Sequence, residues 1–308
     1  MTSEPPTERC SLQARAAAEP LIGTAPTAAA WIAVEHPGPW GPVAPKQVPG
    51  LPTELLRRAA QFGARVVLIR RPGRAGGAPA AHRTALLAST APGAGWLTRI
   101  RFTDPEQLLE LDLAALRGPT PGPLGEPDPG TVLLVCAHGR RDRCCAIDGR
   151  ALAAALTADA PTAEVWECTH LGGHRFAPTT LLLPYGLVHG ALNEASALAA
   201  LRAAEQGQVS IDGYRGRSTW TPAGQLAEAA VRTHADEYDA DALTVLSCAP
   251  ARPDTTRVTV AHRDGRHWQV DVDEHPAPRP TAPSCGKPAL TRTHLALRAV
   301  TPLTPTPA

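Results

Sequence analysis

Hydrophobic and polar residues along this chain follow the periods of short strands and amphipathic helices. Residues 31–36 and 65–70 are apolar runs of strand length, as are residues 84–89 and 96–102. Between the first two runs, residues 51–62 place apolar side chains three or four positions apart, as on one face of a helix. The pattern therefore predicts a strand, a helix and three further strands.

A second helix is expected after the last of these strands. The sequence Thr103-Asp-Pro-Glu106 has the form of a capping box, in which side chains at the two ends satisfy free backbone N–H groups. Leu109, Leu113 and Leu116 follow at helical spacing. This helix would complete a first structural unit.

The same order of elements recurs roughly 100 residues further along the chain. The strands predicted there are residues 131–136, 164–168, 179–183 and 187–192, and the helices are residues 148–158 and 193–205. Strand–helix–strand followed by strand–strand–helix is the thioredoxin-like order. We infer an α/β protein with tandem thioredoxin-like units that arose by duplication.

Proline and glycine mark the expected boundaries. Residues 118–130 (GPTPGPLGEPDPG) contain five prolines and four glycines, which favour neither a helix nor a strand ladder. We expect this linker to join a degenerate first unit at residues 21–117 to a second unit at residues 131–210. A further boundary is expected near residues 212–218. The remaining predictions are a small α+β region at residues 213–300, with a helix at 222–234 and strands at 243–248, 257–262 and 267–272, and loose tails at 1–20 and 301–308.

Composition narrows the possible functions. The 308 residues are 43% hydrophobic and 19% charged, which is typical of a globular protein with a sizeable core. A net charge of +1 and 4% aromatic residues give no support for nucleic-acid binding. No run of 18 apolar residues exists, and the acidic, proline-rich start lacks the features of a signal peptide. We expect a cytoplasmic protein that binds neither nucleic acid nor membrane.

Seven cysteines in a reducing compartment favour metal ligands or redox thiols over disulfides. Cys136 and Cys145 have C-x8-C spacing, and His170 and His174 follow as H-x3-H. Both pairs lie on loops after neighbouring predicted strands, so the four side chains are expected to converge. Two thiolates and two imidazoles suit a metal centre, and the long first loop favours a [2Fe–2S] cluster. Each pair would hold one iron, as in Rieske ligation.

The segment from Cys136 to Leu192 resembles the sucrase/ferredoxin-like family. The resemblance rests on Cys136, Cys145 and the sequence HLGGHRFA at residues 170–177. Shorter family-like segments are EPLIGTAP at 19–26, EHPGPWG at 35–41, RGRS at 215–218 and SCG at 284–286. The resemblance implies a thioredoxin-like ferredoxin module and a [2Fe–2S] cluster with two cysteine and two histidine ligands. The residue after Ala177 departs from the family pattern, because it is Pro178 where a small polar residue is expected.

Other interpretations of these side chains stay open. The four ligands also suit a zinc ion in a structural or interaction module, although zinc sites usually space their cysteines two to four residues apart. A thiol-disulfide oxidoreductase would use Cys144, Cys145 or Cys168, but it lacks a C-x-x-C at a helix start. Cys144 adjoins Cys145 and is an alternative ligand. The remaining cysteines, Cys10, Cys248 and Cys285, are expected to be structural or incidental. His138 is expected to be a solvated loop residue and His189 a strand residue.

Arginines crowd the two ligand loops. These residues are Arg140, Arg141, Arg143 and Arg175, with Asp142 as the opposing charge. Such a surface suits either solvent or the docking of an acidic redox partner. The sequence therefore predicts a one-electron carrier or redox sensor rather than an enzyme with its own substrate.

Overall fold

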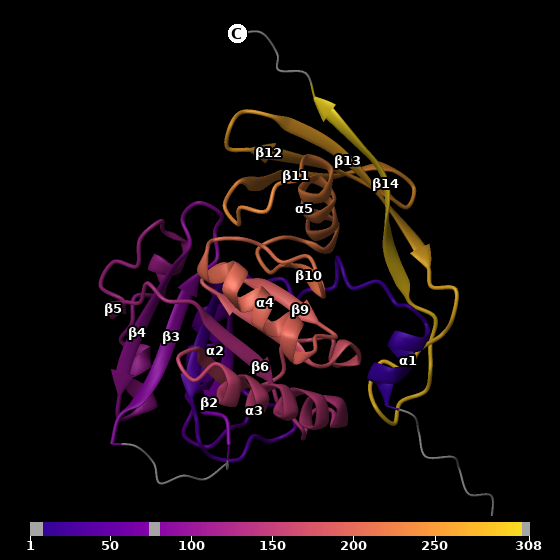
Figure 1. Ribbon diagram of the computed structural model, residues 1–308. Helices are drawn as coiled ribbons and strands as arrows, with labels where there is room; N and C mark the ends of the chain where they lie inside the picture. Colours follow the sequence, from indigo (N-terminus) through magenta and orange to yellow (C-terminus); the bar gives the residue numbers. More distant parts are fainter. Residues whose placement is uncertain (1–8, 74–80, 304–308) are drawn as a thin grey trace, which may run out of the picture.

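The computed structural model describes residues 9–73 and 81–303, which form a large and a small β-sheet (Figure 1). The large sheet has ten strands in the order β10-β9-β8-β6-β7-β2-β1-β3-β4-β5. Its strands are β1 (Ala30–Glu35), β2 (Ala64–Arg70), β3 (Arg83–Ser89), β4 (Trp96–Phe102), β5 (Glu126–Pro127), β6 (Val132–Cys136), β7 (Glu164–Cys168), β8 (Thr179–Leu183), β9 (Leu187–Gly190) and β10 (Tyr214–Arg217). The mixed α/β class expected from the sequence is confirmed.

The two halves of the large sheet repeat one pairing scheme. Strands β1 and β2 are parallel, β3 is antiparallel to β1, and β4 is antiparallel to β3. Strands β6, β7, β8 and β9 pair in the same senses. The halves meet where β2 and β7 pair antiparallel through two residue pairs, one of which joins Ile69 to Cys168. The two predicted units therefore share one continuous sheet.

The helices of the two halves pack on one face of this sheet. The helices are α2 (Thr53–Gln61), α3 (Arg150–Asp159) and α4 (Glu194–Glu205). Alternate strand residues such as Ile32 and Leu133 face these helices, because successive side chains of a strand point to opposite faces. Their neighbours Trp31 and Leu134 belong to a core on the other face, which both halves share. Among the described residues, no helix has the length and apolarity needed to cross a membrane.

The C-terminal region forms the small sheet, with α5 (Pro222–Ala235) packed against it. Its strands, antiparallel in sequence order, are β11 (Leu243–Arg252), β12 (Thr255–His262), β13 (His267–Pro276) and β14 (Thr293–Leu303). The sequence pattern did not predict β14. It also placed residues 214–217 at a boundary, whereas β10 is an edge strand of the large sheet.

The predicted helix after residue 103 is instead two short 3-10 helices, η1 (Pro105–Leu109) and η2 (Leu113–Arg117). The capping box is shifted by one residue, because Asp104 and Gln107 form it. The side chain of Asp112 then accepts a hydrogen bond from the Ala114 N–H and starts the second turn. Two local caps thus divide one apolar stretch into two elements.

Parts of the expected linker and tails are ordered elements. The strand β5 lies in the expected linker and pairs with β4 at the sheet edge, where proline is tolerated. Helix α1 (Cys10–Ala16) lies in the expected N-terminal tail, and a salt bridge of 2.7 Å joins Arg9 to Asp148. Strand β14 extends to residue 303. Residues 1–8 and 304–308 of these tails are outside the described residues.

Candidate metal centre

Cys136 is the last residue of β6 and is fully buried. Its backbone pairs with Cys168 of β7, so the two thiols lie side by side in the shared core. Gly149 packs against the end of this strand, where an added Cβ would lie 1.9 Å from the Cys136 carbonyl oxygen. Only glycine therefore allows the chain before α3 to approach Cys136 this closely.

Cys145 begins a π-helical turn, η3 (Cys145–Gly149), that leads directly into α3. Its side chain is 1% exposed and joins the same core as Cys136. A π-turn widens the helix by one residue, and such turns are frequent at functional sites. Here the turn presents the Cys145 thiol toward the end of β6.

His170 follows β7 in a loop that carries the glycine pair Gly172 and Gly173. Both glycines have positive φ angles, 97° and 71°. The buried Arg215 of β10 donates a hydrogen bond of 3.0 Å from Nη1 to the Gly172 carbonyl, and its other nitrogens donate to Thr24. A Cβ on Gly173 would lie 2.3 Å from Arg215 Nη2. The glycines thus let the histidine loop lie directly on Arg215.

The structure brings three of the four predicted ligands together. The ligand atoms of Cys136, Cys145 and His170 all lie within 4.8 Å of one another. The hydrogen bond with Cys145 lowers the pKa of Cys136 well below its ordinary value, and His170 lowers it further. These two effects together exceed the effect of burial, which raises the pKa. The paired thiols therefore favour the loss of one proton, and a thiol must lose its proton to bind a metal.

His174 lies beside this group but is not part of it. Its ring centroid is 5.0 Å from that of His170. Its Nε2 lies 2.5 Å from the Pro283 carbonyl oxygen and 3.7 Å from Asp142 Oδ2. Burial lowers the pKa of His174, so the ring is neutral near pH 7.

The ring nitrogens of the two histidines that lack a hydrogen-bond partner test whether these residues suit a metal. The buried Nδ1 atoms of His170 and His174 have no hydrogen-bond partner among the described residues, and neither have those of His138, His189 and His294. A buried nitrogen without a partner is costly, and coordination would satisfy it. At His174 the opposite nitrogen donates to a backbone carbonyl, which is the usual arrangement of a metal-bound histidine. The donor set therefore fits the predicted cofactor.

Other residues of the ligand loops differ from expectation. His138 is 1% exposed rather than solvated, and its Nε2–H donates to the Gly41 carbonyl at 2.8 Å. His189 lies in β9 as predicted. The thiol of Cys144 lies away from the Cys145 group and contacts Cys10 and Cys285.

The four predicted docking arginines have different surroundings. Arg140, Arg141 and Arg143 are exposed at the surface. Arg175 instead forms a salt bridge of 2.5 Å with Glu19 and lies over the ring of Phe176. Arg175 is therefore a structural residue that holds the N-terminal segment against the histidine loop.

The sucrase/ferredoxin-like family model matches residues 21–216, nearly two thirds of the chain. The chain belongs to the sucrase/ferredoxin-like family. No curated protein and no solved structure matches it. The matched range includes Cys136, Cys145, His170 and His174, whereas Cys10 and Cys285 lie outside it.

Two of the family-like segments contact residues near the candidate metal centre of this sucrase/ferredoxin-like protein. Thr24 binds Arg215, and Gly41 binds His138. Sequence reasoning treated these segments only as marks of resemblance and missed the role of Arg215. The resemblance of the RGRS segment to the family was the available signal, and the structure shows that both of its arginines are buried.

Proposed function

We propose that this sucrase/ferredoxin-like protein binds a [2Fe–2S] cluster and acts as a one-electron carrier or redox sensor. The ligands would be Cys136, Cys145, His170 and His174. The observation that carries the proposal is the convergence of three of these side chains beside two buried, unpartnered imidazole nitrogens. When bound, such a cluster supplies a one-electron couple, roughly −150 to +300 mV in Rieske centres against about −400 mV in plant-type ferredoxins.

The side chains have separate roles in this proposal. Cys136 and Cys145 provide anionic sulfur, and the two histidines provide neutral nitrogen, which makes the site less negative than four thiolates would. The carbonyl of Pro283 orients His174 by accepting its Nε2–H. Arg215, whose pKa burial lowers to about 9, fixes the loop that carries both histidines.

The proposal extends to the architecture of both units. Each half of the large sheet has the strand order 2-1-3-4, with the first two strands parallel and the others antiparallel. This order supports two thioredoxin-like units, of which the second is the ferredoxin. The first unit then serves as a structural partner that extends the sheet beyond β7.

The surface near His170 supports docking of an acidic redox partner. His170 borders a surface pocket that Lys46, Arg65 and Arg141 also line. Arg140 and Arg143 lie on the same loop as Arg141 and are exposed. A positive surface around a half-buried ligand favours an acidic protein partner in the cytoplasm.

Burial argues against a thiol-disulfide oxidoreductase. Cys144, Cys145 and Cys168 are each at most 1% exposed, so a substrate disulfide has no access to them. Zinc at the same four ligands remains the other outcome that the experiment must separate.

The test is to measure iron, acid-labile sulfide and zinc in protein purified without oxygen. We expect equal amounts of iron and sulfide, about two of each per chain. His170→Ala and His174→Ala should each lose most of both, while Cys248→Ser, a change at an exposed cysteine, keeps them. Iron without labile sulfide, or zinc that the histidine variants lose, would contradict the proposal.

A further inference from the structure

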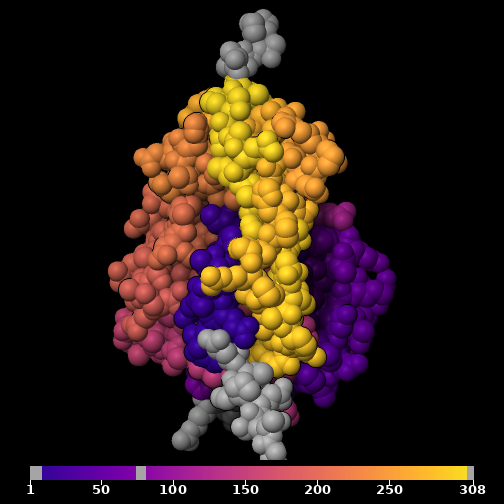
Figure 2. Space-filling model, turned by 90° about the vertical axis from the view of Figure 1, so that its right-hand side faces the viewer, coloured from indigo at the N-terminus to yellow at the C-terminus, as the bar shows by residue number. Residues whose placement is uncertain are grey.

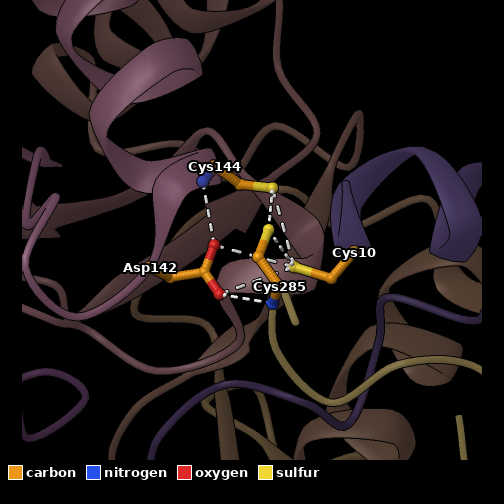
Figure 3. Close-up of side chains that lie close together, drawn as sticks. All are labelled: Cys10, Asp142, Cys144 and Cys285. Atoms are coloured by element: carbon orange, nitrogen blue, oxygen red, sulfur yellow. Dashed lines mark hydrogen bonds between the residues drawn. The ribbon is translucent and has the colours of Figure 1, made fainter. Parts of the chain in front are cut away.

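A second cluster of metal-ligating side chains lies beside the candidate centre (Figure 3). Cys10 comes from α1, Asp142 and Cys144 come from the loop after β6, and Cys285 comes from the segment between β13 and β14. The Sγ–Sγ distances are 3.6 Å for Cys10 and Cys144, 3.3 Å for Cys144 and Cys285, and 3.7 Å for Cys285 and Cys10. Both carboxylate oxygens of Asp142 lie 3.7 Å from Cys10 Sγ.

We propose that Cys10, Cys144, Cys285 and Asp142 bind a zinc ion that is distinct from the [2Fe–2S] cluster. The ligands are three thiolates and one carboxylate oxygen. The ion has a structural role, because it joins both terminal segments to the ferredoxin unit. This site uses none of the four cluster ligands, and two of its cysteines lie outside the family match.

The spacing of the sulfur atoms fits one tetrahedral ion. A Zn–S bond of about 2.3 Å in tetrahedral geometry separates two bound sulfurs by about 3.8 Å. The three observed distances approach this value, and a disulfide would need about 2.0 Å. Sulfurs bound to different irons of a cluster lie farther apart than this. The geometry therefore points to a single metal ion.

The burial of these donors also favours a cation. Cys10 and Cys144 are fully buried, and the side chain of Asp142 is 0% exposed. Three hydrogen bonds stabilise this carboxylate, and loss of the thiol protons beside it would add negative charge that a metal cation compensates. Three of the four donors are buried and Cys285 is half-buried, and a site whose four positions are all filled by protein ligands is typical of structural zinc.

Asp142 is held in place by the segments that the ion would join. Its Oδ2 accepts hydrogen bonds from the Ser284 hydroxyl at 2.7 Å and the Cys285 N–H at 2.9 Å. Its Oδ1 accepts one from the Cys144 N–H at 2.8 Å. Such contacts orient a ligating carboxylate and leave a lone pair of Oδ1 for a metal.

The fold gives a reason for a metal at this place. The cysteines are 134, 141 and 275 positions apart in the chain. The apolar cluster around them contains, besides the three cysteines, only Ala177 and Ala282 among the described residues. Figure 2 shows the N-terminal and C-terminal segments side by side on one face of the molecule. A metal ion would supply the stability that so small a core does not.

The first test is zinc analysis of the full-length protein, with X-ray absorption at the zinc edge. This absorption does not report on iron, so the cluster does not interfere. We expect about one zinc per chain, surrounded by three sulfurs at about 2.3 Å and one oxygen. Absence of zinc after purification without chelators and after zinc addition would overturn the proposal, as would a Cys144–Cys285 disulfide found by mass spectrometry.

The second test uses Cys10→Ser and Cys285→Ser, with Cys248→Ser as the matched control. Cys10→Ser and Cys285→Ser should each lower the zinc content per chain at least tenfold. Iron and labile sulfide should stay unchanged, because the cluster ligands remain. Zinc lost in His174→Ala but retained in Cys285→Ser would overturn the second site. If a variant does not fold, the zinc-edge spectrum of the unchanged protein decides. Failure of the [2Fe–2S] proposal shows instead as missing labile sulfide, whatever the zinc content.

Discussion

The two halves of the ten-stranded sheet share a strand order but differ in chemistry at their strand ends. In the second half, the parallel pair of strands ends with Cys136 beside Cys168. In the first half, the matching pair ends with Glu35 beside Ile69, and the Glu35 carboxylate accepts a hydrogen bond from the Thr84 N–H. The same backbone therefore carries a candidate metal centre in one half and a purely structural contact in the other.

This difference shows that the strand order alone does not make the site. The second half adds a π-turn that presents Cys145 and a glycine loop that lies on Arg215. Both additions bring backbone unusually close to a neighbour, at Gly149 and Gly173. The first half instead stabilises the second through the β2–β7 pairing.

The junction between the halves should be the most sensitive point of the sheet. Arg70 Nε binds Glu167 Oε2 at 2.8 Å, with both side chains under 10% exposed. Arg70→Ala leaves a buried carboxylate without a partner, so we expect a loss of about 3–5 kcal/mol in the free energy of unfolding. Denaturant unfolding measures this loss.

The control for the junction is Arg57→Ala in α2. Its salt bridge with Glu54 is exposed to solvent, so the change in stability should be far smaller. Replacing Arg70 and Glu167 together by methionine should recover part of the loss. If Arg70→Ala and Arg57→Ala destabilise equally, the buried pair does not hold the two halves together.

One glycine in each half, Gly149 and Gly41, can be replaced by alanine to test whether close packing requires a glycine at that position. In Gly149→Ala, the new methyl group would overlap the Cys136 carbonyl oxygen. We expect the free energy of unfolding to fall by about 3 kcal/mol. The proposed cluster should also lose most of its iron. In Gly41→Ala, the methyl group meets nothing within 4 Å. Thermal unfolding and iron analysis of both variants check this, and an iron-replete, fully stable Gly149→Ala protein would refute the packing argument.

A smaller effect is expected from the titration of His189 in the second half. Burial lowers its pKa to about 4, although the Ser210 carbonyl accepts its Nε2–H at 3.0 Å. The unfolded chain binds a proton near pH 6.5 and the folded chain does not. Stability is therefore complete above that pH and is lost as pH falls toward 4. Between pH 7 and pH 5 the loss due to His189 should be about 2 kcal/mol.

The variant His189→Gln removes this titration. Stability curves from pH 7 to pH 5 should be flatter for the variant than for the unchanged protein. The comparison is between the two proteins, since His36, His138 and His174 also have pKa values lowered by burial. Equal slopes in both proteins would mean that folding does not lower the pKa of His189.

Much of the fold could be predicted because its strands are continuous apolar runs. Strands β7 and β8 have the predicted bounds, and α2 lies within the predicted range. The predicted helix after residue 103 was wrong, because apolar spacing alone does not reveal the second cap at Asp112. The exposed strand β14 was missed because it has few buried residues to create a pattern.

The candidate site was predictable in part for a related reason. Cys136, Cys145, His170 and His174 lie at or after the ends of two adjacent parallel strands, β6 and β7, so local spacing was informative. Cys10 and Cys285 gave no such signal, because the nearest partner of each is more than 130 positions away. Arg215 was missed because sequence does not show that an arginine is buried.

The amino-acid sequence by itself determined the repeated strand order, the family and the four residues of the candidate cluster site. These depend on periodicity and spacing, which are local properties. Only the tertiary structure decided that the two units share one sheet, that Arg215 supports the histidine loop, and that three distant cysteines meet around Asp142. Such contacts depend on how the terminal segments pack, and no local pattern in the chain encodes that packing.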